Sequence, residues 1–512
     1  MRLWGWVLLA GLVAAPASAQ PDRTRLAEAF PKIDAIFTTY AREAHVPGIA
    51  WGVIVDGTLA HTGTAGVRDV ATGAPVEARS VFRIASMTKS FTALAILKLR
   101  DEGRLSLDDP AERYVPELKA LPYPTADAPR VTIRHLLTHS AGFPEDNPWG
   151  DRQLAIGEER MTELLRQGIP FSNVPGVAYE YSNFGFAILG RVVSAASGTP
   201  YRTYLQREIL TPLGLSSTTL EPGDVPGDRL VRGYRREDET WVLEPPLADG
   251  AFGAMGGMLT SLEDLGRYVA YFLSAWPPRD GPENGPVRRA SLREMQQVWR
   301  MRPASVSRDG TGLALSAGGY GYGLRVTQSC AFRHVVAHAG GLPGYGSLML
   351  WLPEYGVGLV AMGNLTYTSW GPRFDAALEA LRRTGGLVPR APEPSPELTA
   401  ASRAVASLVA RWDDGLVRSL AADNLLLDEP LDRRRAAFEA VRARHGVCRA
   451  EKGTFEVENA LRGTWTMPCE RGAVRVALTL SPTVPPRVQH LSASSLDAMP
   501  AAGGPSACPA VP

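Results

Sequence analysis

The most informative stretch of this chain is VFRIASMTKSFTALAILKLRDEG, residues 81–103. Its apolar residues predict a helix that begins near Ser86 and ends at Gly103, because glycine commonly terminates helices. Ser86 and Lys89 are three residues apart, so a helix places both side chains on one face. Ser86 also stands at the helix N-terminus, where the helix dipole favours the negative charge of acyl transfer.

A serine and a lysine at this spacing are weak evidence alone, since surface helices carry such pairs without any catalytic role. Composition adds weight, because the chain has only five lysines among its 54 Lys and Arg residues. No other lysine has a serine three residues before it. A buried lysine can lose its proton and act as a base, whereas arginine stays charged. Lys89 therefore has a chemical reason to lie beside Ser86.

Strand-like runs stand on both sides of this helix and predict an α/β (α+β) fold. GIAWGVIVD (48–56) and TLAHTGTAGVRD (58–69) come before it. From about residue 86 to 250 the pattern is helical. Strand-like runs then return in close succession, as antiparallel strands would: YGYGLRV (320–326), HVVAHAGG (334–341), YGSLMLWLP (345–353) and GVGLVAMGN (356–364). The simplest architecture is one antiparallel sheet built from both chain ends, flanked by helices, with a helical insertion.

Composition shifts near residue 386 and predicts a domain boundary. Residues 386–397 are rich in proline, which favours an extended linker between a domain at 22–385 and a smaller module at 398–498. In that module, helical stretches at 401–420 and 431–446 precede strand-like segments, which indicates a small α+β module. Residues 499–512 resemble a disordered tail.

The first residues predict export. Arg2, an apolar run and the small residues before position 20 are typical of a signal peptide cut after Ala19. The run is too short to span a bilayer comfortably, so we expect no stable membrane insertion and a periplasmic or secreted protein. Acidic and basic residues nearly cancel, which argues against a nucleic-acid partner.

Export would expose the four cysteines to an oxidising compartment. Cys448 and Cys469 are the favoured disulfide pair, while the pairing of Cys330 and Cys508 stays open. No metal site is expected. The close pair His135 and His139 lacks an acidic neighbour of the HExxH kind, so we interpret it as structural.

Two further polar motifs stand out, although each has an ordinary structural explanation. Tyr181, Ser182 and Asn183 precede an apolar helix and form the chain's one Tyr-x-Asn. Alone, this triplet reads as a capped helix start. His338, Ala339, Gly340 and Gly341 stand at the end of a strand, and a strand that simply ends in a glycine turn would also explain them.

Taken together and in this order, the three motifs resemble those of the penicillin-recognising serine hydrolases. That superfamily includes class C β-lactamases, DD-carboxypeptidases, D-aminopeptidases and family VIII carboxylesterases. VTIRHLLTHSAG, EILTPLGL, AFGAMGGMLTSLEDL and GGLPGYGS also look like the family. The resemblance covers roughly residues 25–385 and implies a β-lactamase/transpeptidase-like fold.

The resemblance implies a role for each motif residue. Ser86 would be the nucleophile, and Lys89 with Tyr181 would remove its proton as one coupled unit. Tyr181 would also pass a proton to the leaving group. Asn183 would orient the substrate carbonyl. The backbone N–H groups of Ser86 and Gly341, the latter following Gly340, would form the oxyanion hole. No cofactor is implied.

The third motif departs from the family in a way that bears on substrate. His338 stands where β-lactamases and carboxypeptidases usually have lysine, and Ala339 where they have a hydroxyl residue. A mostly neutral histidine should bind a substrate carboxylate weakly. We therefore expect hydrolysis of a small-molecule ester, amide or peptide, with weak β-lactamase activity.

Other functions stay open at this point. DD-carboxypeptidase, D-aminopeptidase and β-lactamase are alternatives within the family. A non-catalytic acyl-binding sensor or peptidoglycan-binding protein is a rival from another class. An α/β-hydrolase is disfavoured, since the chain has no Gly-x-Ser-x-Gly. The role of the C-terminal module and the oligomeric state are not predicted.

Overall fold

The computed structural model describes residues 20–309, 312–390 and 392–496. The predicted signal peptide (1–19), the predicted tail (499–512) and Cys508 lie outside the described residues. The described part of the chain divides between Val388 and Pro389 into two compact units.

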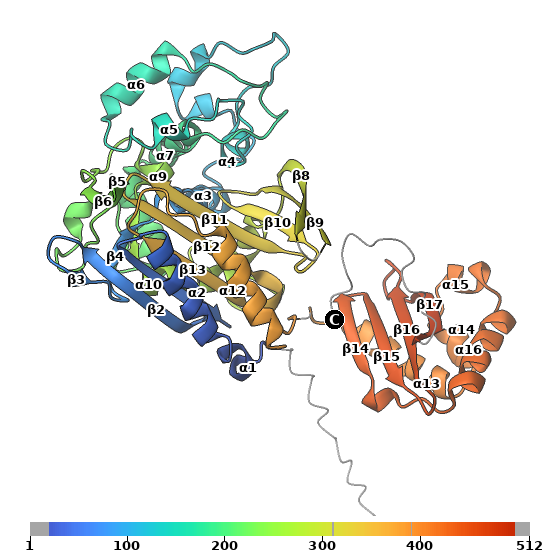
Figure 1. The fold of residues 1–512 in the computed structure, drawn as a ribbon. Helices are drawn as coiled ribbons and strands as arrows, with labels where there is room; N and C mark the ends of the chain where they lie inside the picture. Colours follow the sequence, from blue (N-terminus) through green and yellow to red (C-terminus); the bar gives the residue numbers. More distant parts are fainter. Residues whose placement is uncertain (1–19, 310–311, 391, 497–512) are drawn as a thin grey trace, which may run out of the picture. The chain divides into compact units, whose positions relative to one another are not determined.

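A nine-stranded sheet forms the centre of residues 21–388, in the order β3-β2-β1-β13-β12-β11-β10-β9-β8 (Figure 1). Its neighbouring strands are antiparallel. The first strands of the chain pair with the last, since Ile49 of β1 lies opposite Gly363 of β13. This confirms the predicted sheet built from both chain ends. The strands are β1 (Gly48–Val55), β2 (Thr58–Asp69), β3 (Ala74–Pro75), β8 (Arg300–Asp309), β9 (Gly312–Tyr320), β10 (Arg325–Ser329), β11 (Val335–Leu342), β12 (Tyr345–Leu352) and β13 (Val357–Gly363).

Helices cover both faces of this sheet. The eight residues of β1 are all buried. Its side chains alternate between two core clusters, with Ala50 and Ile54 in one and Trp51 and Val53 in the other. The first cluster includes residues of α10 (Leu262–Leu273), and the second includes residues of α2 (Phe30–Glu43) and α12 (Gly371–Arg383). A short α1 (Arg23–Ala27) precedes α2.

The helical insertion lies between two short paired strands, β4 (Val81–Arg83) and β7 (Leu259–Ser261). Its central helix α3 (Thr88–Asp101) follows a 3-10 turn at Ala85–Met87 and is buried over most of its length. The predicted apolar helix is therefore confirmed. The other helices of this region and its C-terminal flank are α4 (Ile133–Leu137), α5 (Asn147–Gly150), α6 (Glu158–Gln167), α7 (Asn183–Ser197), α8 (Tyr201–Leu205), α9 (Gly253–Gly256) and α11 (Arg289–Met295).

Two local predictions were wrong. The segment expected to be helical contains a hairpin, β5 (Tyr234–Glu237) with β6 (Thr240–Leu243). Its turn residues Asp238 and Glu239 both have positive φ without the glycine that signals such turns. The run 320–326 is not one strand, because residues 321–324 connect β9 to β10 and Gly323 is left-handed.

Residues 389–496 form an α+β unit with its own four-stranded antiparallel sheet, β14 (Thr454–Asn459), β15 (Arg462–Pro468), β16 (Ala473–Leu480) and β17 (Val488–Ser495). Its helices are α13 (Pro396–Ala410), α14 (Asp414–Leu420), α15 (Asp423–Asp428) and α16 (Leu431–His445). The helix α13 begins inside the predicted linker, because Ser395 caps it and proline suits its first position.

The predicted disulfide between Cys448 and Cys469 is present in this unit. The two cysteines face each other as an isolated antiparallel bridge. Among the helices of the described residues, none is long and apolar enough to cross a membrane.

Candidate active site

Ser86 sits at the point where the chain turns from β4 into α3. It is the middle residue of the 3-10 turn, and its exposed fraction is 8%. Ala85 before it has a φ of +50°, a left-handed conformation that is uncommon for alanine. Such backbone strain is frequent at functional sites, where the surrounding fold imposes it.

Lys89 is fully buried, and its Nζ lies within hydrogen-bond distance of three oxygen atoms. Its Nζ is 3.1 Å from Ser86 Oγ, 2.7 Å from Asn183 Oδ1 and 2.7 Å from the backbone oxygen of Met255. Burial lowers the pKa of Lys89 to about 7, although the carboxylates of Asp151 and Asp146 oppose this shift. A large share of Lys89 is therefore an uncharged amine at neutral pH.

The neutral form of Lys89 fits these contacts well. An uncharged amine has two N–H groups and one lone pair. The two shorter contacts, to Asn183 and Met255, use the N–H groups. The lone pair is then left for the hydroxyl proton of Ser86, at the longest of the three distances.

Tyr181 completes the group around Ser86. Lys89 Nζ lies 4.9 Å from the centre of the Tyr181 ring. Burial raises the pKa of Tyr181, and its hydrogen bond with Ser86 only partly offsets that. Tyr181 is thus a protonated phenol.

Asn183 is fully buried at the start of α7. Its Oδ1 accepts from Lys89, and its Nδ2 donates to Asn147 Oδ1 at 3.0 Å. Ser182 is the N-cap of α7, so the triplet is also a capped helix start, its structural explanation in the sequence analysis. The Asp146 carboxylate accepts from the backbone N–H of Asn183 at 2.6 Å and holds the turn. Asn183 therefore positions Lys89, and substrate orientation stays a prediction.

The strand β11 passes close to the 3-10 turn that contains Ser86 because Gly340 has no side chain. A Cβ at Gly340 would lie only 2.1 Å from the backbone oxygen of Ile84. Ser347 on the neighbouring β12 also donates to that oxygen, at 2.9 Å. This close approach brings β11 into contact with the turn that contains Ser86. The role of Gly341 in an oxyanion hole stays a prediction.

His338 does not act as a cation. It is buried, its Nδ1 lies 2.7 Å from the oxygen of Ala339, and its Nε2 lies 2.8 Å from the hydroxyl of Tyr320. Nδ1 must carry the proton to meet a carbonyl oxygen, so Nε2 accepts from Tyr320. Burial and the nearby Arg325 hold the pKa of His338 well below its usual range.

Arg325 of β10 is a charged residue that the sequence motifs did not indicate. Its positive charge lowers the pKa of Tyr181, of Tyr179 and of His338. Its buried Nε has no hydrogen-bond partner in the described part of the chain. The site therefore holds a permanent cation, supplied by a different strand from the one we expected.

The carboxylate of Asp151 was also missed. Its side chain is buried, and burial raises its pKa to about 6 while Lys89 lowers it. Tyr367 donates to Asp151 Oδ2 at 3.0 Å. No spacing signal in the sequence marks Asp151 or Tyr367, because both lie in irregular segments between helices and strands.

His135 and His139 have structural contacts. Thr132 and His135 form a capping box at the start of α4. His139 Nδ1 accepts from the backbone N–H of Ser182 at 3.1 Å, and its ring lies 4.2 Å from that of Tyr181. Over the described ranges, no group of three or more His, Cys, Asp or Glu side chains is arranged to hold a metal.

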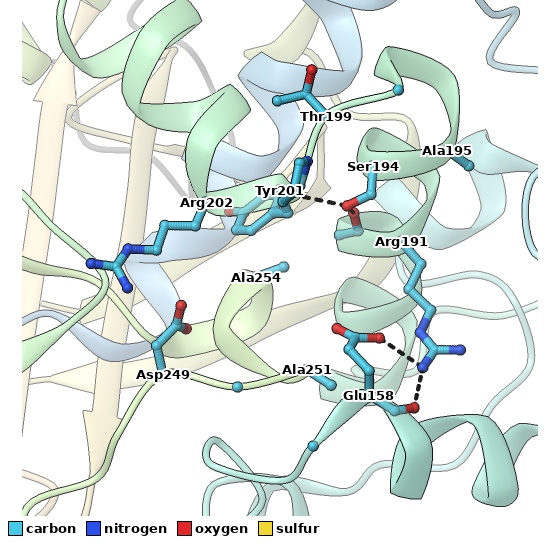
Figure 2. Close-up of a pocket in the computed structure, with 15 residues that line it drawn as sticks. Glu158, Arg191, Ser194, Ala195, Thr199, Tyr201, Arg202, Asp249, Ala251 and Ala254 are labelled. Carbon is cyan, nitrogen blue, oxygen red and sulfur yellow. Dashed lines mark hydrogen bonds and ion pairs between the residues drawn. The ribbon is translucent and has the colours of Figure 1, made fainter.

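A cavity of about 900 Å³ lies apart from Ser86, between α7, α8 and the segment before α9 (Figure 2). Ala254 lines it, while the next residue, Met255, accepts from Lys89. Asp249 and the pair of Glu158 with Arg191 lie at this cavity. Ser86 and Tyr181 are not among its lining residues.

Comparisons with known proteins show the family of this chain and proteins that resemble it. The family model described as Beta-lactamase matches residues 33–384. Protein flp of Staphylococcus aureus (strain COL) is 27% identical over 336 residues, which are 65% of this chain and 63% of flp. Penicillin-binding protein 4* of Bacillus subtilis (strain 168) is 27% identical over 308 residues, 57% of this chain and 62% of that protein. This chain therefore matches less than two thirds of either relative's length.

A solved structure has a similar fold. It is the octameric penicillin-binding protein homologue from Pyrococcus abyssi, with a TM-score of 0.59 and 24% sequence identity. The match covers 88% of this chain and 91% of that chain.

Proposed function

The chain belongs to the Beta-lactamase family of serine hydrolases, and on this basis we propose that it cleaves ester or amide bonds through an acyl-enzyme on Ser86. The observation that carries the proposal is the placement of Lys89. Its amine is buried and has a pKa of about 7. Its nitrogen lies 3.1 Å from Ser86 Oγ, within hydrogen-bond distance. A general base works best when its pKa is near the operating pH.

The proposed reaction begins when Ser86 Oγ attacks the substrate carbonyl carbon while its proton passes to the Lys89 amine. The oxygen of the tetrahedral intermediate accepts from the N–H groups of Ser86 and Gly341. Tyr181, a protonated phenol, donates its proton to the leaving group as the ester or amide bond breaks, and Lys89 returns a proton to Tyr181. Water then attacks the acyl carbon while one of its protons passes to the Lys89 amine. Lys89 returns this proton to Ser86 Oγ as the acyl C–O bond breaks, and the carboxylic acid is released.

The neutral His338 supports esters and amides without a carboxylate as substrates. Arg325 favours a second candidate, a DD-carboxypeptidase, because a cation with an unused N–H attracts the carboxylate of a D-Ala-D-Ala terminus. A carboxylate is also present in β-lactams. The two candidates therefore differ in whether turnover depends on Arg325.

One turnover panel tests these proposals. Its substrates are an aryl acetate, nitrocefin and a D-Ala-D-Ala peptide. Its proteins are wild type, Ser86→Ala, Arg325→Gln and the control Ser90→Ala. Ser90 is a suitable control because it is a serine of α3 four residues after Ser86. We expect Ser86→Ala to lose at least about 10³-fold in kcat on every substrate that wild type cleaves. Ser90→Ala should stay within about tenfold of wild type. Arg325→Gln should leave the aryl acetate rate within about threefold.

A fluorophosphonate probe should label Ser86 and no other residue. Labelling of another residue would refute the proposal. A peptide rate above the ester rate that falls about 10²-fold in Arg325→Gln would replace the esterase proposal with the carboxypeptidase. Labelling without turnover of any substrate would instead favour an acyl-binding sensor.

We propose further that the mature protein is periplasmic or secreted. The charged, apolar and small-residue pattern of residues 1–19 supports this location.

A further inference from the structure

Tyr367 reaches across the candidate active site from the loop between β13 and α12. Its ring packs on Gly341, where an added Cβ would lie 2.7 Å from Tyr367 Cδ1. Its hydroxyl donates to Asp151 Oδ2 at 3.0 Å. The residue is 49% exposed, so one side of the ring faces solvent. One end of the side chain thus covers the proposed oxyanion strand.

The other end of this contact belongs to the helical insertion. Asp151 follows α5 and is 3% exposed. Gly150 before it packs on Asn183, where an added Cβ would lie 2.9 Å from Asn183 Cβ. The carboxylate of Asp151 also acts electrostatically on Lys89. The hydrogen bond between Tyr367 and Asp151 therefore joins the sheet side of the site to the helical side.

The loop backbone sets the direction of the Tyr367 side chain. Tyr367 has a φ of +54°, a left-handed conformation that is unusual for a tyrosine. Its N–H donates to the oxygen of Tyr345 at 3.2 Å. Its neighbours are held as well, since the N–H of Thr366 donates to Tyr234 and that of Thr368 to Leu365. A strained conformation held by this many contacts indicates a required position.

We propose that Tyr367, tied to Asp151, forms a bar over the acyl side of the candidate active site and limits the length of the acyl chain that Ser86 accepts. This inference rests on the proposed function. In the proposed reaction, the carbonyl oxygen of the substrate faces the N–H of Gly341 and the leaving group faces Tyr181. The acyl chain is then the part of the substrate that must pass Tyr367.

The test compares kcat/KM for p-nitrophenyl octanoate with kcat/KM for p-nitrophenyl acetate, which share a leaving group. We expect Tyr367→Ala to raise the octanoate-to-acetate ratio about tenfold, because it removes the bar. Tyr367→Phe keeps the ring on Gly341 and loses only the hydrogen bond, so the ratio should rise about threefold. If Tyr367→Ala does not fold, judged by its thermal unfolding, Tyr367→Phe carries the test.

Tyr355→Ala is the matched control. Tyr355 packs on Phe332 in the core cluster that contains α2 and α12, and the ratio should not change there. An octanoate-to-acetate ratio within twofold of wild type in both Tyr367 variants, with turnover still dependent on Ser86, would refute the proposed role of Tyr367. It would leave the proposed function standing. Full ester turnover in Ser86→Ala would overturn the proposed function and this inference with it.

Discussion

Burial changes the chemistry of Lys89. Desolvation brings its pKa to about 7, and Asp151 and Asp146 keep it from falling further. Tyr181, desolvated beside it, keeps its proton. Burial thus favours the uncharged form of both neighbouring groups, an amine that can accept a proton and a phenol that can donate one.

This division predicts the pH dependence of ester hydrolysis. The neutral amine of Lys89 is the active form, so kcat/KM should rise with pH and reach half its plateau near pH 7. The carboxylate of Asp151 favours the ammonium form. Asp151→Asn should therefore lower the pKa of Lys89 and move the midpoint down by about one pH unit. A pH series of kcat/KM on an uncharged aryl ester measures this midpoint.

Asp249→Asn is the control for this shift. Burial also raises the pKa of Asp249 to about 6, but this carboxyl is not among the main influences on Lys89. Its variant should keep the wild-type midpoint. A midpoint that moves upward in Asp151→Asn, or that does not move, would exclude Lys89 as the base.

At the scale of elements, the site depends on two segments that approach each other without intervening side chains. The strand β11 passes the turn that contains Ser86 at Gly340. Ser347 of β12 donates a hydrogen bond to the backbone oxygen of Ile84, just before this turn. Close packing of this kind tolerates little added volume.

Gly340→Ala should therefore damage both stability and catalysis. The new Cβ would meet the backbone oxygen of Ile84, which no side-chain rotation can relieve. We expect a loss of about 2 kcal/mol in the free energy of unfolding and a fall in kcat of at least about tenfold. Gly371→Ala is the control, since a Cβ there has nothing within 4 Å. Thermal unfolding and ester turnover provide the two measurements, and a wild-type Tm and kcat in Gly340→Ala would contradict the packing argument.

At the scale of the whole molecule, each unit has a core of its own. The clusters of residues 21–388 run from Leu26 to Leu381, and that of the C-terminal unit runs from Leu398 to Leu491. Every residue assigned to the reaction lies in the first unit. The disulfide between Cys448 and Cys469 lies in the second and closes a loop over a separation of 21 residues.

Removing that disulfide should destabilise one unit and spare the reaction. In the double variant Cys448→Ser and Cys469→Ser, the free energy of unfolding of the C-terminal unit should fall by about 3 kcal/mol. Calorimetry should show one transition at lower temperature and a second one unchanged, with ester turnover as in wild type. Equal shifts of both transitions, or lost turnover, would show that the units are not independent.

Much of this arrangement was readable from the amino-acid sequence, because strands and helices follow from local periodicity. The two strand-like runs in residues 48–69 predict β1 and β2, and the apolar run after Ser86 predicts α3. Ser86, Lys89, Tyr181 and Asn183 were found through motifs that the structure brings together. The hairpin at β5 and β6 was missed, since its turn has no glycine.

Tertiary structure alone decided the pKa shifts of Lys89 and Tyr181. Lys89 meets Asn183 and Met255 across 94 and 166 residues, and its pKa depends on the burial those contacts create. Arg325, Asp151 and Tyr367 joined the site in the same way, from a strand and two loops with no local signal. Sequence patterns determine elements because their causes are local, whereas desolvation and charge act between residues that only the folded chain brings close.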